Sequence, residues 1–151
     1  MTNLEPARSR EQRIHDVRER LEKDVDVWVS TASADGGPVL VPLSFVWDDG
    51  ALIMSTKRVN ATARNLTPGG PVMLSLGHTR DVVLIEATTT VIEGTELPTA
   101  SADAFARQAG FDPRDREAWI YLRAVPQVIR TWREENELAG RVVMRDGAWL
   151  G

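Results

Sequence analysis

The sequence predicts one domain, residues 1–151, that is mainly β and antiparallel, with peripheral helices. Short β-rich runs follow one another from residue 27 to residue 92, and Asp-Gly pairs stand between apolar runs at residues 49–50 and 146–147. An Asp-Gly pair in this setting is a strong signal for a β-hairpin. A length of 151 residues is enough to bury a sizeable core, and no repeat or linker divides the chain.

Helices are expected at the start of the chain and between strands. The N-terminal segment, residues 1–25, contains a helix from residue 9, where Ser9 and Gln12 fit a capping box. Apolar side chains recur there every three or four residues, which favours a helix with one buried face. A short helix is expected at residues 60–66, and a helical insert at residues 99–124.

The helical insert is expected to consist of two helices. Thr99 or Ser101 would cap the first helix, and Gly110 would end it. Pro113 suits the first position of the second helix, which is expected to run to about Ala124.

The remaining segments predict strands, because β-branched and apolar residues recur between turn clusters. Within the second strand Pro42 indicates an edge position or a bulge, since proline lacks the N–H that a ladder needs. The expected strands are residues 27–31, 39–47, 51–56, 72–76, 82–92, 127–132, 141–144 and 148–150.

The composition excludes several kinds of chemistry. Without cysteine, the chain has no disulfide, thiolate metal site or cysteine nucleophile. A net charge of −4 argues against a broad nucleic-acid surface. The longest apolar runs, such as residues 82–85, are too short to span a membrane, and residues 1–26 are too charged for a signal peptide. The expected location is the cytoplasm, with no membrane or nucleic-acid partner.

Few residues suit acid–base or metal chemistry. His15 lies on the charged helix and is expected to be solvated, whereas His78 follows a strand and is a weaker candidate for a place near a ligand. No Gly-x-Ser-x-Gly or His-Glu-x-x-His motif occurs, and there is no phosphate-binding glycine loop. The aspartate pairs stand at turns and helix ends, where aspartate bonds the local backbone. We therefore assign no catalytic and no metal-binding residue.

Arginine dominates the cationic residues: of eighteen, only Lys23 and Lys57 are lysine. A GC-rich genome explains most of this bias. The alternative is recognition of phosphate or carboxylate, which the planar guanidinium group binds with two parallel hydrogen bonds.

The segment from residue 55 to residue 66 joins a strand to a short helix and gathers hydroxyl, amide and cationic side chains. The start of a helix presents free N–H groups, and Lys57, Arg58 and Arg64 would complete an anion pocket there. The alternative is a helix capped by Asn60 with a solvated basic face. The residue types alone leave both interpretations open.

The order of these features resembles the pyridoxamine 5′-phosphate oxidase-like superfamily. The resemblance covers roughly residues 25–93, with the Asp-Gly hairpin, the Ser-Thr strand end and the Ala-Arg-Asn-Leu helix. The closing run Ile129-Arg130-Thr131-Trp132 is similar to the last strands of the family. The resemblance implies a split β-barrel and a homodimer with FMN or the deazaflavin F420 at its interface. It also implies an oxidoreductase in which the cofactor carries out hydride transfer on a small molecule.

The resemblance also implies which side chains contact the cofactor. Ser55 and Thr56 match positions that contact the isoalloxazine ring or the ribityl chain. Leu43 and Ser44, on the preceding strand, are expected to run along the cofactor. Among the five tryptophans, Trp132 is the one expected nearest to it.

The phosphate end of the cofactor is where the sequence departs from the family pattern. Asn60 and Thr62 fall at positions that contact the phosphate, but Ala61-Thr62 stand where the family commonly has an Arg-Lys pair. Lys57 and Arg58, or Arg64, would have to supply the missing charge.

Three functional hypotheses remain. The first is an oxidoreductase that uses FMN or F420. The second is a dimer that holds FMN, F420, haem or a related tetrapyrrole without catalysis, which the missing Arg-Lys pair favours more than an intact motif would. The third is a dimeric barrel without a cofactor.

Overall fold

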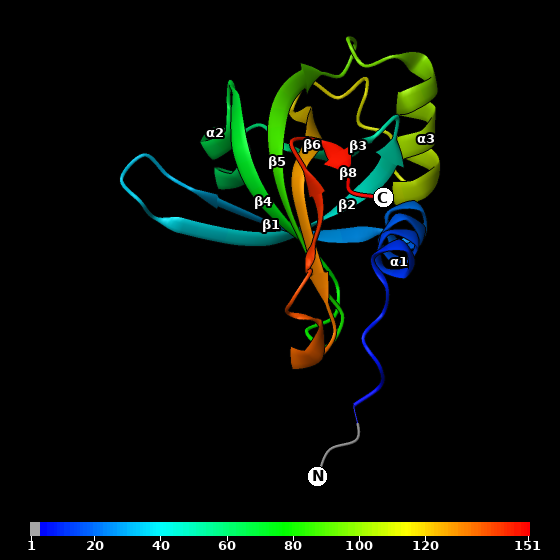
Figure 1. Ribbon diagram of the computed structural model, residues 1–151. Helices are drawn as coiled ribbons and strands as arrows, with labels where there is room; N and C mark the ends of the chain where they lie inside the picture. The colour runs from blue at the N-terminus through cyan, green and yellow to red at the C-terminus, as the bar shows by residue number, and fades with distance from the viewer. Residues whose placement is uncertain (1–3) are drawn as a thin grey trace.

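The computed structural model describes residues 4–151 and contains a closed barrel of six antiparallel strands (Figure 1). The barrel order is β3-β2-β1-β4-β5-β6, and β3 pairs with β6 to close it, while β7 and β8 continue from β6. This arrangement confirms the predicted antiparallel β-barrel with peripheral helices. The elements are α1 (Arg10–Lys23), β1 (Asp26–Ala32), β2 (Pro38–Asp48), β3 (Ala51–Lys57), α2 (Ala61–Leu66), β4 (Gly69–Leu76), β5 (Val82–Glu93), α3 (Thr99–Ala109), β6 (Trp119–Trp132), a 3₁₀ turn η1 (Glu135–Glu137), β7 (Val142–Arg145) and β8 (Ala148–Trp149).

Two hairpin turns form where Asp-Gly pairs predict them. Asp49 and Gly50 have φ angles of 48° and 75°, and Asp146 and Gly147 have 52° and 76°. A two-residue hairpin turn whose twist matches that of the flanking strands requires positive φ at both central residues. The turns join β2 to β3 and β7 to β8, so both predicted hairpins are confirmed.

The first half of β2 is an edge, as Pro42 indicates. Pro42 lies opposite Trp28 of β1, whereas pairing with β3 begins only at Phe45. Within residues 4–151 the other edge of this half is unpaired, so the N–H that Pro42 lacks is not needed for strand pairing there. In Figure 1 the β1–β2 hairpin extends from the barrel as an arm.

The second helix of the predicted insert does not exist. Residues 119–124 belong instead to β6, which is 14 residues long, and Pro113 lies in the irregular segment before it. Alternating side chains explain the difference: Ile120 and Leu122 fill the barrel, while Tyr121 packs on the other face against Phe105 of α3. Pairing with both β3 and β5 outweighs a local helix signal.

Helix α3 ends at Gly110, as predicted, with a φ of 72°. Its start differs from the prediction, because Pro98 occupies the cap position and no side chain caps the helix. The Ser101 hydroxyl donates instead to Asp48 Oδ2 over 2.7 Å. This bond ties α3 to the end of β2.

Helix α1 packs on the barrel through one apolar stripe, as its spacing predicts. Ile14, Val17 and Leu21 are buried in the main core, and Ser9 Oγ accepts a bond from the backbone N–H of Gln12. No helix among residues 4–151 is long and apolar enough to cross a membrane.

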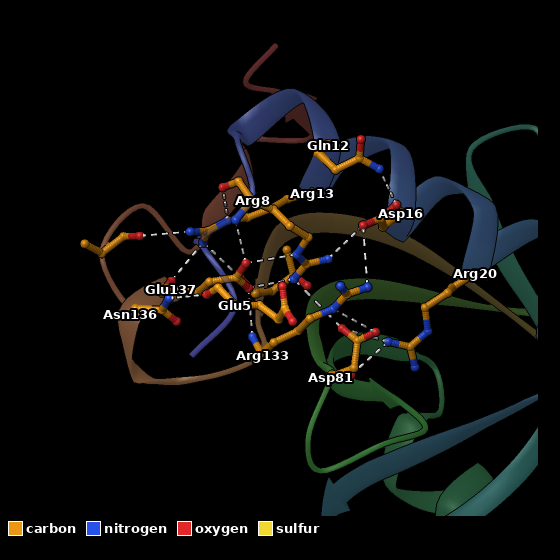
Figure 2. A network of polar contacts seen from close by, with 12 residues as sticks. Glu5, Arg8, Gln12, Arg13, Asp16, Arg20, Asp81, Arg133, Asn136 and Glu137 are labelled. Carbon is orange, nitrogen blue, oxygen red and sulfur yellow. Dashed lines mark hydrogen bonds and ion pairs between the residues drawn. The ribbon is translucent and has the colours of Figure 1, made fainter. Parts of the chain in front are cut away.

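A polar network anchors residues 5–8 to α1 and to the β6–β7 connection (Figure 2). Arg8 bonds to Asp16 of α1 and to Glu137 of η1, with nitrogen–oxygen distances of 3.0 and 2.8 Å. The guanidinium group of Arg13 is buried and donates to the carbonyl oxygen of Glu137 over 2.8 Å. Through these contacts the segment around Arg8, α1 and the β6–β7 connection form one structural unit.

Candidate functional site

The strand end that carries Ser55 and Thr56 is the first part of the expected site. Both residues are buried, and neighbours on a strand point to opposite faces. Ser55 Oγ donates to the carbonyl oxygen of Ile120 over 2.7 Å, which uses its only hydrogen within the fold. Thr56 Oγ1 accepts from Asn60 Nδ2 over 3.0 Å, so its own hydrogen has no protein acceptor within residues 4–151.

The turn after β3 places two cationic residues around Asn60. The Asn60 backbone N–H donates to the Lys57 carbonyl oxygen, and its carbonyl accepts from the Arg64 N–H, each over 3.0 Å. Asn60 and Arg64 are four residues apart and therefore share one side of the helical turn. Asn60 occupies the cap position of α2, but its side chain caps no N–H because it bonds Thr56 instead.

Lys57 and Arg64 both keep an uncompensated charge. Both side chains are exposed, and neither makes an ion pair with any residue in the described part of the chain. The Lys57 ammonium lies 5.8 Å from the ring centre of Trp119, at a distance that suits a cation–π contact. An anion approaching this turn would thus meet two available cations.

Arg58, the third expected cation, is engaged within the protein. Its Nη1 and Nη2 atoms bond the two carboxylate oxygens of Glu93 over 2.8 Å each, and Nη2 also donates to the Glu117 carbonyl over 2.7 Å. These hydrogen bonds hold the pKa of Glu93 below its ordinary value. Arg58 therefore joins the turn to the end of β5 and to the segment that leads into β6.

The remaining expected contacts lie around this turn on β2 and α2. Leu43 and Ser44 precede Phe45, which pairs with Met54, so they lie level with the end of β3. Leu43 packs on the core, whereas Ser44 Oγ bonds Asp26 Oδ1 over 3.2 Å. Thr62 is buried beneath α2, with 2% of its surface exposed.

Trp132 lies far from the other expected residues. It is the last residue of β6 and pairs with Val82, whereas Lys57 pairs with Trp119, the first residue of that strand. At about 3.3 Å per residue, the two ends of β6 are roughly 40 Å apart along the strand. One chain therefore brings together Ser55, Thr56, Lys57, Asn60, Thr62 and Arg64, with Leu43 and Ser44 beside them, but not Trp132.

Comparison with known proteins identifies the family. A family model described as pyridoxamine 5′-phosphate oxidase matches residues 14–133. The chain belongs to this family. The comparison with curated proteins gives no match.

Solved structures of other members share the oxidase-family fold. An F420 reductase has a TM-score of 0.60 at 16% identity, covering 74% of this chain and 94% of its own. General stress protein 26 from Bacillus anthracis has a TM-score of 0.58 at 17% identity, covering 83% and 95%. HutZ, the haem storage protein from Vibrio cholerae, has a TM-score of 0.56 at 15% identity, covering 75% and 89%. At these identities the likeness concerns the fold alone.

Neither histidine lies among the candidate site residues at the end of β3. His15 is exposed on α1 with its Nε2 atom 3.4 Å from Glu19. His78 is exposed in the β4–β5 loop, which leads to Val82 and thus lies toward the Trp132 end of β6. Within residues 4–151 no group of three or more histidine, aspartate or glutamate side chains could hold a metal ion.

The sequence reasoning missed an exposed apolar face on the outside of the barrel. Strand register places Pro42, Trp28, Ser75 and Leu84 in one row across four strands. The adjacent row contains Leu40, Ser30, Met73 and Glu86. Trp28, Leu40 and Met73 are 43%, 63% and 38% exposed, which is high for large apolar side chains. The alternation within β1 was the signal, since Val27 and Val29 on the opposite side are buried.

Proposed function

We propose that this protein is an oxidoreductase that binds FMN or F420 between two copies of the chain and transfers a hydride to or from a small molecule. The observation that carries the proposal is the turn after β3, where Lys57 and Arg64 flank Asn60 without ion-pair partners in the described chain. Membership of the oxidase family supports a flavin-type cofactor at this turn. FMN and F420 both contain a phosphate group, which two cations and an amide would bind well.

The residues present fit the phosphate of such a cofactor, although Ala61 and Thr62 replace the usual Arg-Lys pair. Arg58 would have to leave Glu93 to reach a phosphate, so we assign the charge to Lys57 and Arg64. Each charge-assisted hydrogen bond to the phosphate would contribute roughly 1.5–3 kcal/mol.

The chain's own side chains would orient the cofactor and keep water away from it. When bound, the cofactor supplies the hydride chemistry. The Thr56 hydroxyl has a hydrogen without a protein acceptor among the described residues and is therefore suited to donate to a polar atom of the cofactor. Leu43 lies level with the end of β3, packs on the core and offers an apolar surface there. No catalytic residue is assigned, because the cofactor itself would supply the hydride chemistry.

A second copy would complete the site. The exposed face around Trp28, Leu40 and Met73 is the kind of surface that self-association covers. Trp132 is too far from Lys57 to serve the same cofactor within one chain. We therefore assign Trp132 to the cofactor held mainly by the other copy of a homodimer.

Spectroscopic titration tests the cofactor. The purified protein is titrated with FMN, F420 and haem, and we expect saturable binding of FMN or F420. The oxidoreductase hypothesis is overturned if neither binds more tightly than about 100 μM.

Mixed dimers test the division of the site between two copies. One tagged chain carries Lys57→Ala and Arg64→Ala, and a second, differently tagged chain carries Trp132→Ala. Their mixed dimer keeps one intact composite site, so we expect half the wild-type amount of cofactor bound at wild-type affinity. The matched control pairs a wild-type chain with a chain carrying all three substitutions, which leaves no intact composite site. Wild-type affinity in the control and not in the mixed dimer would overturn the shared site.

The second candidate function is a non-catalytic dimer that holds haem or a related tetrapyrrole. A solved structure with the same fold is described as a haem storage protein, and the turn lacks the Arg-Lys pair. Saturable haem binding without binding of FMN or F420 would select this function, and binding of none of them would leave the barrel without a cofactor.

A further inference from the structure

Four arginines converge on a cleft beside β7. Arg10 is the first residue of α1, and Arg130 lies near the end of β6. Arg141 directly precedes β7, and Arg145 is its last residue. The cleft has a volume of about 470 Å³. Its apolar lining includes Val142 and Leu150.

The charge around this arginine cleft is not balanced. Among residues 4–151, no aspartate or glutamate lines it. Arg130 pairs with Glu86 on the adjacent strand, at a nitrogen–oxygen distance of 2.5 Å. Within the described part of the chain, the side chains of Arg10 and Arg141 donate only to uncharged carbonyl oxygens, those of Leu150 at 3.2 Å and Leu138 at 3.0 Å.

The Arg145 side chain is exposed and makes no hydrogen bond or ion pair with any residue from 4 to 151. Guanidinium groups stay protonated at any physiological pH. Together with Arg10 and Arg141, Arg145 therefore places three uncompensated positive charges at one cleft, although the chain has a net charge of −4. Like charges held at one site repel each other, and an anion between them would remove that repulsion.

We propose that the arginine cleft binds a small, multiply charged oxyanion with phosphate or carboxylate groups. Three guanidinium groups, one from α1 and two from β7 and the residue before it, offer paired N–H donors, which match the oxygen atoms of a phosphate or a carboxylate. A volume of about 470 Å³ is in the range of small-molecule sites. Val142 and Leu150 would contact the apolar part of such a ligand. The proposal does not depend on a flavin-type cofactor. The two anions that test it, pyrophosphate and citrate, contain no ring system of the flavin type.

Isothermal titration of the full chain with pyrophosphate and with citrate tests the proposal. We expect one saturable site per chain for at least one of the two anions, with an affinity that falls as salt is added. Binding of pyrophosphate assigns the phosphate class, and binding of citrate assigns the carboxylate class. The absence of saturable binding of either anion below about 1 mM would overturn the proposal.

Two double variants separate this site from a general charge effect. We expect Arg141→Gln with Arg145→Gln to weaken anion binding at least tenfold. The control is Arg107→Gln with Arg116→Gln, which removes the same charge from exposed positions outside the cleft, and we expect it to leave the affinity unchanged. An equal loss in both double variants would overturn the proposal. If the first pair does not fold, Arg145→Gln alone serves, because the Arg145 side chain makes no hydrogen bond or ion pair within residues 4–151 and the substitution leaves the backbone pairing with Ala148 in place.

Discussion

The carboxylate of Glu137 accepts hydrogen bonds from both the backbone N–H and the guanidinium group of Arg8, a residue 129 positions earlier in the chain. The donor–acceptor distances are 2.8, 3.0 and 2.8 Å, and the Arg133 N–H adds a bond of 2.9 Å. Glu137 is only 3% exposed. These bonds, above all those from the Arg8 side chain, lower the pKa of Glu137 to about 2. Figure 2 shows this carboxylate among the arginines that surround it.

Acid should destabilise the protein through Glu137. Because its pKa is about 2 in the folded chain and 4.5 without these contacts, the stabilisation is complete above pH 4.5 and is lost as the pH falls toward 2. The pKa difference corresponds to about 3 kcal/mol of unfolding free energy at most. Urea unfolding at pH 7, 4 and 3 measures the loss. In Glu137→Gln this part of the pH dependence should disappear, and an unchanged dependence would contradict the assignment.

Substitution should show that Lys57 and Arg64 bind the cofactor, whereas Arg58 stabilises the fold. Lys57→Ala with Arg64→Ala should weaken FMN or F420 binding at least tenfold and leave the urea midpoint unchanged, because neither side chain has an ion pair in the described chain. Arg58→Ala should instead lower the midpoint, since it removes the bonds to Glu93 and Glu117. Spectroscopic titration beside urea unfolding measures both effects. A loss of binding in Arg58→Ala alone would place the phosphate at Arg58.

The apolar face should control self-association. Trp28→Glu puts a charge at the centre of this face, where Trp28 lies between Pro42 and Ser75, and should weaken the proposed dimer at least tenfold. Sedimentation velocity measures the change. Leu138→Glu is the matched control, because Leu138 is also exposed but lies outside the face. A dimer that survives Trp28→Glu would place the interface elsewhere.

Two glycines should differ in their tolerance of alanine. A Cβ at Gly94 would lie 2.4 Å from the Arg114 carbonyl oxygen, so the backbone would have to move. Gly94→Ala should therefore lower the unfolding free energy by about 1–3 kcal/mol. Gly110 has no atom near its Cβ position but a φ of 72°, so Gly110→Ala should cost about 1–2 kcal/mol through backbone strain alone. Thermal unfolding compares the two, and a fully stable Gly94→Ala would contradict the close contact.

Local patterns predicted most strands and both tight hairpins. The Asp-Gly turns at residues 49–50 and 146–147 depend only on the residues within them, because few residue types tolerate positive φ. The same local reasoning failed for residues 112–124, where a proline suggested a helix start. Pairing of β6 with two other strands decided that segment, and its partners lie far away in the sequence.

The sequence predicted which segment contains the candidate site but not how its side chains are arranged. The residue types of 55–66 allowed either an anion-binding turn or a capped helix with a solvated basic face, and the structure gathers most of these side chains around Asn60. The engagement of Arg58 could not be predicted, because its partner Glu93 is 35 residues away and belongs to another strand. The roles of Arg141 and Arg145 were equally hidden in a sequence rich in arginine.

The sequence by itself determined the types of most elements, both tight turns and the absence of cysteine chemistry. These properties follow from residue spacing along a few turns of backbone and from composition. Only the tertiary structure decided that β3 and β6 close the barrel, which arginines meet a carboxylate and which remain uncompensated. Such pairings depend on which segments pack together, and for Arg8 and Glu137 that choice spans almost the whole chain.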